Sequence, residues 1–109
     1  MLEGVPDVVR RYFELDPHDV DGFVSLFGDD ATVVDEGKTY RGLGEIRAWR
    51  TGPAIKYTYA TEVLDCEDEG AGRYLVTARL TGNFPGGTVD LRCDFTIMSD
   101  LICRLVIAP

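Results

Sequence analysis

The sequence has few cysteines and no long apolar run. Its three cysteines are odd in number and widely spaced, so they predict neither a disulfide framework nor a CxxC pair: Cys66, Cys93 and Cys103. No apolar run approaches the roughly 20 residues that a membrane span needs. Residues 1–11 also lack the apolar core of a signal peptide. We therefore expect a cytoplasmic protein with no membrane partner.

Residues that typically hold metals or nucleic acids are also scarce. His18 is the only histidine, and a lone histidine without a cysteine cluster cannot build a typical zinc site. The 11 lysines and arginines are scattered among 19 aspartates and glutamates, and the net charge of -8 repels nucleic acid. The Gly-rich segment 82–87 connects two predicted strands, whereas a phosphate-binding loop opens a helix. We expect no metal, no cofactor and no nucleic-acid partner.

What the sequence does contain is typical of one ordinary globular domain. The chain has 109 residues, which is a common size for a single domain. Apolar residues make up 45% and charged residues 28% of the chain. No internal repeat, linker or low-complexity segment divides it, so residues 1–109 are predicted to form a single domain.

Apolar stripes at helical spacing predict three helices in the first half of the chain. The first runs from about Val5 to Leu15 and contains Tyr12 and Phe13. The second starts at Asp16-Pro17 and ends at Gly28-Asp29-Asp30. The third covers residues 42–50, with one apolar and one basic side: Leu43, Ile46 and Trp49 against Arg47 and Arg50.

The rest of the chain reads as strands. A short strand is expected over residues 31–35, and residues 38–40 also read as extended. Four longer strands follow, joined by short turns, over residues 55–66, 73–81, 88–98 and 101–108. Consecutive strands with short connections indicate an antiparallel meander. Helices followed by a meander indicate an α+β fold, in which helices laid on a curved sheet enclose a ligand cavity.

Several segments resemble a known superfamily. Residues 8–13 (VVRRYF) and 21–35 (DGFVSLFGDDATVVD) resemble the opening of the nuclear transport factor 2-like superfamily, in particular ketosteroid isomerases and SnoaL-like polyketide cyclases. Residues 82–91 (GNFPGGTVDL) and 102–107 resemble SnoaL-like domains. The resemblance implies a cone-shaped, cystatin-like fold with three N-terminal helices packed on a curved antiparallel sheet. It leaves the reaction open, because this fold hosts isomerases, cyclases, hydrolases and proteins without catalysis.

The same resemblance singles out two residues for catalysis. Asp35 follows a short apolar strand and matches the general base of ketosteroid isomerases, and an apolar wall would raise its pKa toward neutrality. The alternative is a solvated aspartate in an Asp-Glu-Gly turn. Tyr12 matches the tyrosine of the oxyanion hole, where a phenol donates a hydrogen bond to a developing enolate. The alternative there is an ordinary core aromatic.

A second acid of the isomerase site is missing from this sequence. Ketosteroid isomerases carry a protonated aspartic acid on the third long strand, and alignment on Phe95 places Cys93 at that position. Strand residues alternate between faces, so Asp94 should point away from the pocket that Cys93 faces. This departure puts efficient steroid isomerisation in doubt.

Limonene epoxide hydrolase, which uses an Asp-Arg-Asp set, offers a second comparison within the superfamily. Arg79 matches its arginine, but Thr81 stands where the first acid belongs and the last strand offers only Leu105 and Val106. We therefore exclude that reaction. Arg79 stays a candidate cation for a ligand oxygen, with a surface ion pair as its alternative.

Two functions are compatible with these residues. The first is a cofactor-free isomerase or cyclase acting on a flat apolar ketone. The second is a non-catalytic module that binds a small apolar molecule or only a second copy of itself. Both predict a homodimer, because the outer sheet face would otherwise be exposed. The expected substrate-binding residues are Phe13, Phe27, Trp49, Tyr57, Tyr59, Arg79 and Cys93.

Overall fold

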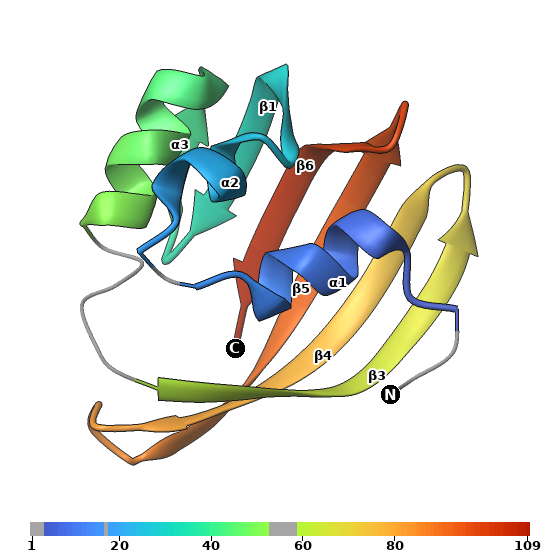
Figure 1. Cartoon of the computed structure of the whole chain (residues 1–109). Helices are drawn as coiled ribbons and strands as arrows, with labels where there is room; N and C mark the ends of the chain where they lie inside the picture. The colour runs from blue at the N-terminus through green and yellow to red at the C-terminus, as the bar shows by residue number, and fades with distance from the viewer. Residues whose placement is uncertain (1–3, 17, 53–58) are drawn as a thin grey trace.

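A computed structural model describes residues 4–16, 18–52 and 59–109, and it confirms the predicted α+β architecture. Three helices lie against one face of a curved six-stranded sheet with the strand order β2-β1-β6-β5-β4-β3 (Figure 1). The elements in chain order are α1 (Asp7–Glu14), α2 (Val20–Val24), β1 (Phe27–Asp35), β2 (Lys38–Arg41), α3 (Gly42–Thr51), β3 (Tyr59–Gly70), β4 (Arg73–Gly82), β5 (Thr88–Met98) and β6 (Leu101–Ala108).

Helix α1 crosses the concave face of the sheet (Figure 1). The predicted stripe is confirmed: Val8 and Val9 are buried, while Tyr12 and Phe13 are partly buried against the core. The helix is followed by Leu15 in an extended conformation, where the sequence predicted its end. The apolar side of α1 thereby forms a wall of the space between helix and sheet.

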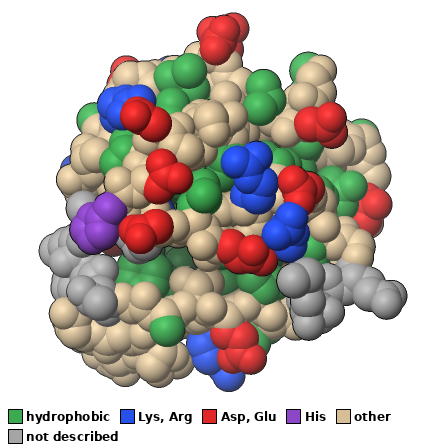
Figure 2. Space-filling view, in the orientation of Figure 1, with side chains coloured by type: hydrophobic (Ala, Val, Ile, Leu, Met, Phe, Trp, Pro, Cys, Tyr) green, Lys and Arg blue, Asp and Glu red, His purple; other side chains and the backbone are tan. Residues whose placement is uncertain are grey.

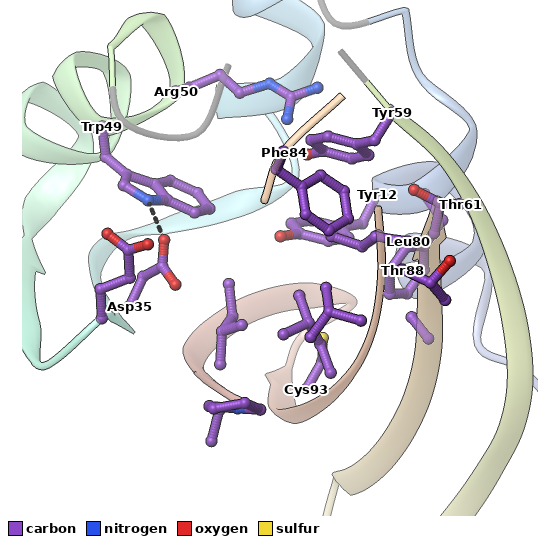
Figure 3. Close-up of a pocket in the computed structure, with 18 of the residues that line it drawn as sticks. Tyr12, Asp35, Trp49, Arg50, Tyr59, Thr61, Leu80, Phe84, Thr88 and Cys93 are labelled. Carbon is purple, nitrogen blue, oxygen red and sulfur yellow. Dashed lines mark hydrogen bonds between the residues drawn. The ribbon is translucent and has the colours of Figure 1, made fainter. Parts of the chain in front are cut away.

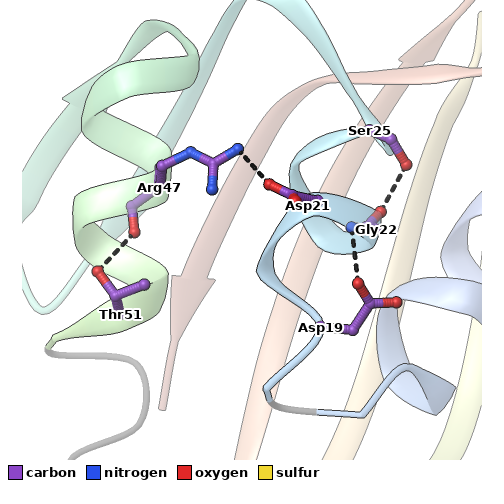
Figure 4. Close-up of polar contacts among 6 residues, drawn as sticks. All are labelled: Asp19, Asp21, Gly22, Ser25, Arg47 and Thr51. Carbon is purple, nitrogen blue, oxygen red and sulfur yellow. Dashed lines mark hydrogen bonds and ion pairs between the residues drawn. The ribbon is translucent and has the colours of Figure 1, made fainter.

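Helix α2 is shorter than the sequence pattern predicted. It covers five residues, and its first turn is capped by the Asp19 carboxylate, which accepts a hydrogen bond of 2.9 Å from the amide of Gly22 (Figure 4). At the other end, the Ser25 hydroxyl donates to the Gly22 carbonyl at 2.6 Å. The prediction that Gly28-Asp29-Asp30 terminates a helix is therefore wrong.

Residues 28–30 belong to strand β1, which pairs with β6 on either side of them. Phe27 is in register with Ile102, and the Ile102 amide donates to the Leu26 carbonyl at 2.8 Å. The register shifts between Phe27 and Thr32, which marks an irregularity in the pairing. Pairing with a distant strand thus overrides the local helix-ending signal of Gly and Asp.

Helix α3 packs on β1 and β2 and is tied to α2 by an ion pair. Arg47 reaches Asp21 at 2.8 Å (Figure 4). Both side chains are largely exposed, so we assign this pair a small contribution of at most about 1 kcal/mol.

Strands β3 to β6 form the predicted antiparallel meander, each pairing with the next. Strand β3 extends to Gly70, beyond the predicted end at Cys66, and the predicted residues 55–58 lie outside the described residues. Strand β1 pairs with β2 in an antiparallel and with β6 in a parallel sense. This parallel pair joins the first part of the chain to the last strand.

The core fills the space between helices and sheet with one continuous cluster. Its largest fully buried side chains come from both layers, and include Phe23, Leu26, Ile46, Phe95, Ile102 and Leu105. Within the described residues, no helix has the length and apolar character needed to cross a membrane. Toward β3 and β4 the two layers separate, and the cavity described next lies between them.

Candidate functional site

A cavity of about 1080 Å³ lies between the helices and the concave face of the sheet. This volume is slightly above the usual range for small-molecule sites, about 300–1,000 Å³. Apolar groups of β4, β5 and β6 form its floor: Ala78, Leu80, Val89, Leu91, Cys93 and Ile107. Figure 2 shows hydrophobic side chains inside a hollow beside His18, which also lines the cavity. The cavity has room for a flat apolar molecule of several rings.

Asp35 lies at the end of β1 and lines this cavity. The next two residues, Glu36 and Gly37, both have positive φ angles and turn the chain into β2. The indole Nε1 of Trp49 donates a hydrogen bond of 3.0 Å to the Asp35 carboxylate (Figure 3). Burial raises the pKa of Asp35, and the Trp49 hydrogen bond opposes that rise. Asp35 is therefore a partly enclosed carboxylate, unlike the fully solvated turn residue considered as the alternative.

Tyr12 projects from α1 into the same cavity, with its hydroxyl on the side where Asp35 and Trp49 lie (Figure 3). Its ring is surrounded by four aromatic neighbours at centroid distances between 4.9 and 6.5 Å, namely Phe13, Phe23, Phe27 and Phe95. Burial raises the pKa of Tyr12 well above its ordinary value. At neutral pH the phenol therefore keeps its proton and can donate a hydrogen bond to a ligand oxygen.

Cys93 occupies the cavity floor, as the strand alternation predicted. The thiol is buried, and this burial together with the charge of Asp35 raises its pKa to about 12. It is therefore neutral at physiological pH and a poor nucleophile. Its neighbour Asp94 points to the other face of the sheet, where it pairs with Arg73 at 3.0 Å.

The structure brings three more of the predicted binding residues to the cavity. Phe13, Trp49 and Tyr59 line it, and Trp49 also packs against Tyr40 with a centroid distance of 6.1 Å. The prediction for Tyr57 lies outside the described residues.

Two predicted binding residues do not line the cavity. Phe27 is buried in the core behind Tyr12, with a centroid distance of 6.5 Å between the rings. Arg79 lies on the outer face of β4, where its guanidinium holds the Asp90 carboxylate through two hydrogen bonds of 2.8 and 3.1 Å. Strand alternation explains this placement, because Ala78 and Leu80 on either side of Arg79 face the cavity.

Arg50 is the main cavity residue that the sequence analysis did not identify. The helical pattern placed it with Arg47 on the basic side of α3, opposite the apolar residues, but its side chain is buried, with 8% of the residue exposed. Its guanidinium carbon lies 4.2 Å from the centroid of the Phe23 ring, and the residue lines the cavity (Figure 3). No local signal distinguishes a buried arginine from an exposed one beside a buried tryptophan.

The cavity lining offers acid–base groups but no metal site. In residues 4–16, 18–52 and 59–109, no group of three or more His, Cys, Asp or Glu side chains is arranged to hold a metal ion. A partly buried carboxylate, a protonated phenol and a buried guanidinium share an otherwise mainly apolar cavity. This combination can accept, donate and return protons on an apolar ligand.

Fold and cavity together define a small pocket protein with the nuclear transport factor 2-like, or cystatin-like, architecture. A family model described as a SnoaL-like domain matches residues 9–99. The chain therefore belongs to the SnoaL-like domain family, as its opening segments predicted.

Solved structures agree with this assignment. A proposed polyketide cyclase from Sinorhizobium meliloti is 36% identical, with 95% of each chain covered and a TM-score of 0.88. A second similar structure is a protein with a ketosteroid isomerase-like fold from Catenulispora acidiphila, solved in complex with trimethylamine. It is 17% identical and superimposes with a TM-score of 0.83, and the match covers 96% of this chain and 86% of that chain. A comparison with curated proteins finds no match.

Proposed function

We propose that this protein is a cofactor-free isomerase or cyclase that moves a proton next to a carbonyl group of a flat apolar substrate. The observation that carries the proposal is the Asp35 carboxylate, partly buried at the wall of an apolar cavity and held by Trp49 at 3.0 Å. Likeness to a proposed polyketide cyclase at 36% identity supports the same class of chemistry.

Asp35 and Tyr12 have complementary roles in this proposal. The ionised Asp35 carboxylate takes a proton from the carbon beside the substrate carbonyl. The electron pair of that C–H bond forms the carbon–carbon double bond of the enolate, and the π pair of the carbonyl group moves to its oxygen. The Tyr12 phenol donates a hydrogen bond to the resulting enolate oxygen. An isomerase then returns the proton to a different carbon. In a cyclase the enolate carbon instead attacks a second carbonyl of the same substrate, and the oxygen of that carbonyl takes the proton from Asp35.

The binding residues and the assembly state complete the proposal. Phe13, Trp49 and Tyr59 would hold the flat substrate, while the apolar floor around Cys93 excludes water from the enolate. We also propose that the protein works as a homodimer, joined through the outer face of its sheet.

The proposal is tested by following hydrogen–deuterium exchange at the carbon beside the carbonyl of 2-tetralone, a flat bicyclic ketone, by NMR in D₂O. The wild-type protein should accelerate this exchange. The variant Asp35→Asn should lose about 10²–10⁴-fold in rate, because a positioned general base contributes that much. Tyr12→Phe should lose about 10²-fold, as expected for one oxyanion donor.

Asp30→Asn is the matched control, because Asp30 lies on the same strand as Asp35 but is exposed. It removes the same charge and should leave the exchange rate unchanged. Wild-type exchange no faster than buffer, or an Asp35→Asn variant as fast as wild type, would contradict the proton-transfer proposal. The protein would then be a ligand-binding module without turnover. The presence of Cys93 where ketosteroid isomerases have a second acid agrees with that alternative.

A further inference from the structure

Arg50 is a buried cation without a counter-charge in the described part of the chain. Only 8% of the residue is exposed, and its Nε atom is buried without a hydrogen-bond partner. No ion pair among the described residues includes Arg50. The guanidinium carbon lies over the Phe23 ring, 4.2 Å from its centroid.

The position of Arg50 directs this charge at the cavity. Figure 3 shows the guanidinium extending from α3 away from Asp35, toward the side where Tyr59 lies. The positive charge of Arg50 lowers the pKa values of both Tyr12 and Tyr59, against the larger effect of burial, so both phenols are within its electrostatic reach. Asp35 and Arg50 therefore face one cavity, and the charge of Asp35 acts on the same two phenols by raising their pKa values.

A guanidinium in this setting favours a specific kind of ligand group. Burying a cation without a partner is unfavourable, so an anion that enters the cavity gains a strong interaction. The planar fork of N–H donors matches a carboxylate with two parallel hydrogen bonds. Arg50 is the only lysine or arginine among the described lining residues, and Asp35, Glu36 and His18 also line the cavity. The single positive charge of Arg50 balances one negative charge on a ligand. A phosphate dianion would carry a second negative charge that Arg50 does not balance and that the carboxylates of Asp35 and Glu36 would repel.

We propose that the cavity selects a flat apolar molecule that carries one carboxylate, and that Arg50 binds this carboxylate. The inference deepens the proposed function and rests on it for the substrate class, which becomes an apolar keto acid. Its carboxylate contacts Arg50, and its ketone lies between Tyr12 and Asp35. The binding preference itself needs no turnover and can be measured separately.

The test compares two probes of the same shape, 2-naphthoate and the neutral 2-naphthamide, by titration calorimetry. The single tryptophan of the chain, Trp49, lines the cavity, so its indole N–H signal in NMR reports whether each probe enters. Wild-type protein should bind naphthoate at least tenfold more tightly than naphthamide. Arg50→Gln should abolish that preference, and Arg50→Lys should keep part of it.

Arg47→Gln is the control, because Arg47 lies one turn earlier on α3 with an exposed side chain. It should keep the wild-type preference for naphthoate. Equal binding of both probes to the wild type would overturn the inference without any variant, so the test survives even if Arg50→Gln fails to fold. A preference that persists in Arg50→Gln, or binding of neither probe, would overturn it as well.

Failure of this inference is distinguishable from failure of the proposed function. If Asp35→Asn stops proton exchange while wild type binds both probes equally, only the role of Arg50 is wrong. If Arg50→Gln abolishes the naphthoate preference while wild type shows no exchange with 2-tetralone, only the catalytic proposal is wrong.

Discussion

Two opposing influences act on the carboxylate of Asp35. Its partly apolar surroundings raise its pKa, whereas the hydrogen bond from the Trp49 indole at 3.0 Å favours the charged form and lowers it. The nearby charge of Glu36 adds to the rise. The indole therefore keeps available the ionised carboxylate that a general base needs.

Replacing Trp49 by phenylalanine should raise the pKa of Asp35 further. The ring is retained, but the N–H donor that stabilises the carboxylate is lost. Exchange requires ionised Asp35, so the rate should rise with pH in both proteins, and that rise should move to higher pH in Trp49→Phe. The shift is measured by a ¹³C NMR titration of the Asp35 carboxyl group and by the pH dependence of 2-tetralone exchange.

Tyr40→Phe provides the comparison for this experiment. Tyr40 packs against Trp49 at 6.1 Å between ring centroids, but it is not among the groups that shift the pKa of Asp35. In Tyr40→Phe the Asp35 carboxyl group should keep its wild-type pKa. An Asp35 pKa that stays constant or falls in Trp49→Phe would show that the indole does not stabilise the carboxylate.

Residue roles were predictable from the sequence where strand alternation applies, and not where burial depends on tertiary packing. Cys93 and Asp94 face opposite sides of β5 as their order along the strand requires. Arg79 faces outward by the same rule, so its prediction as a ligand-binding residue was wrong and the alternative, a surface ion pair, is correct. Arg50 could not be predicted, because its burial depends on the Phe23 ring of another helix.

At the scale of elements, the turn between β3 and β4 is held by close contact with β5. Gly72 has a φ of +79°, and the amide of Ile97 donates to its carbonyl at 2.8 Å. A Cβ atom at Gly72 would lie 2.4 Å from the carbonyl oxygen of Ile97, which is backbone and cannot rotate away. Only glycine fits this position.

Gly72→Ala should therefore destabilise the protein strongly. The left-handed conformation alone costs an alanine about 1–2 kcal/mol, and the backbone clash adds to that. The free energy of unfolding is measured by urea denaturation. Gly70→Ala is the matched control, since Gly70 has a φ of +83° in the same turn but no atom within 4 Å of the added Cβ. If both variants lose the same free energy of unfolding, the clash between the added Cβ and the Ile97 carbonyl oxygen has no energetic cost.

Elements were predictable where the signal was local. The turn at Ser99-Asp100 and the meander β3 to β6 follow from short connections between strand-forming runs. The boundary between α2 and β1 was not predictable in this way, because Phe27 continues the apolar spacing of the helix. Its pairing with Ile102 places it in a strand, and that pairing involves the opposite end of the chain.

At the scale of the molecule, the outer sheet face is the surface that a homodimer would use. Two ion pairs cross it, Arg73 with Asp94 and Arg79 with Asp90, and Leu75 lies beside Asp94 in the strand register. We expect sedimentation equilibrium to give twice the chain mass of 12.1 kDa at micromolar concentration. Leu75→Asp should shift this equilibrium toward the monomer, because it adds a charge to the buried face. A wild-type monomer at that concentration would remove the dimer from the proposal.

The parallel pairing of β1 with β6 has a consequence for how the protein folds. Asp35 is in register with Ile107, so the strand that carries the carboxylate gains this neighbour only after the chain has been synthesised beyond residue 107. The hairpins of β3 to β6 involve short loops and can close early, whereas the β1–β6 contact closes a long loop and is entropically costly. The ligand cavity is therefore completed late in folding, and a nascent chain that stops before β6 holds the proposed catalytic base on an unpaired strand edge.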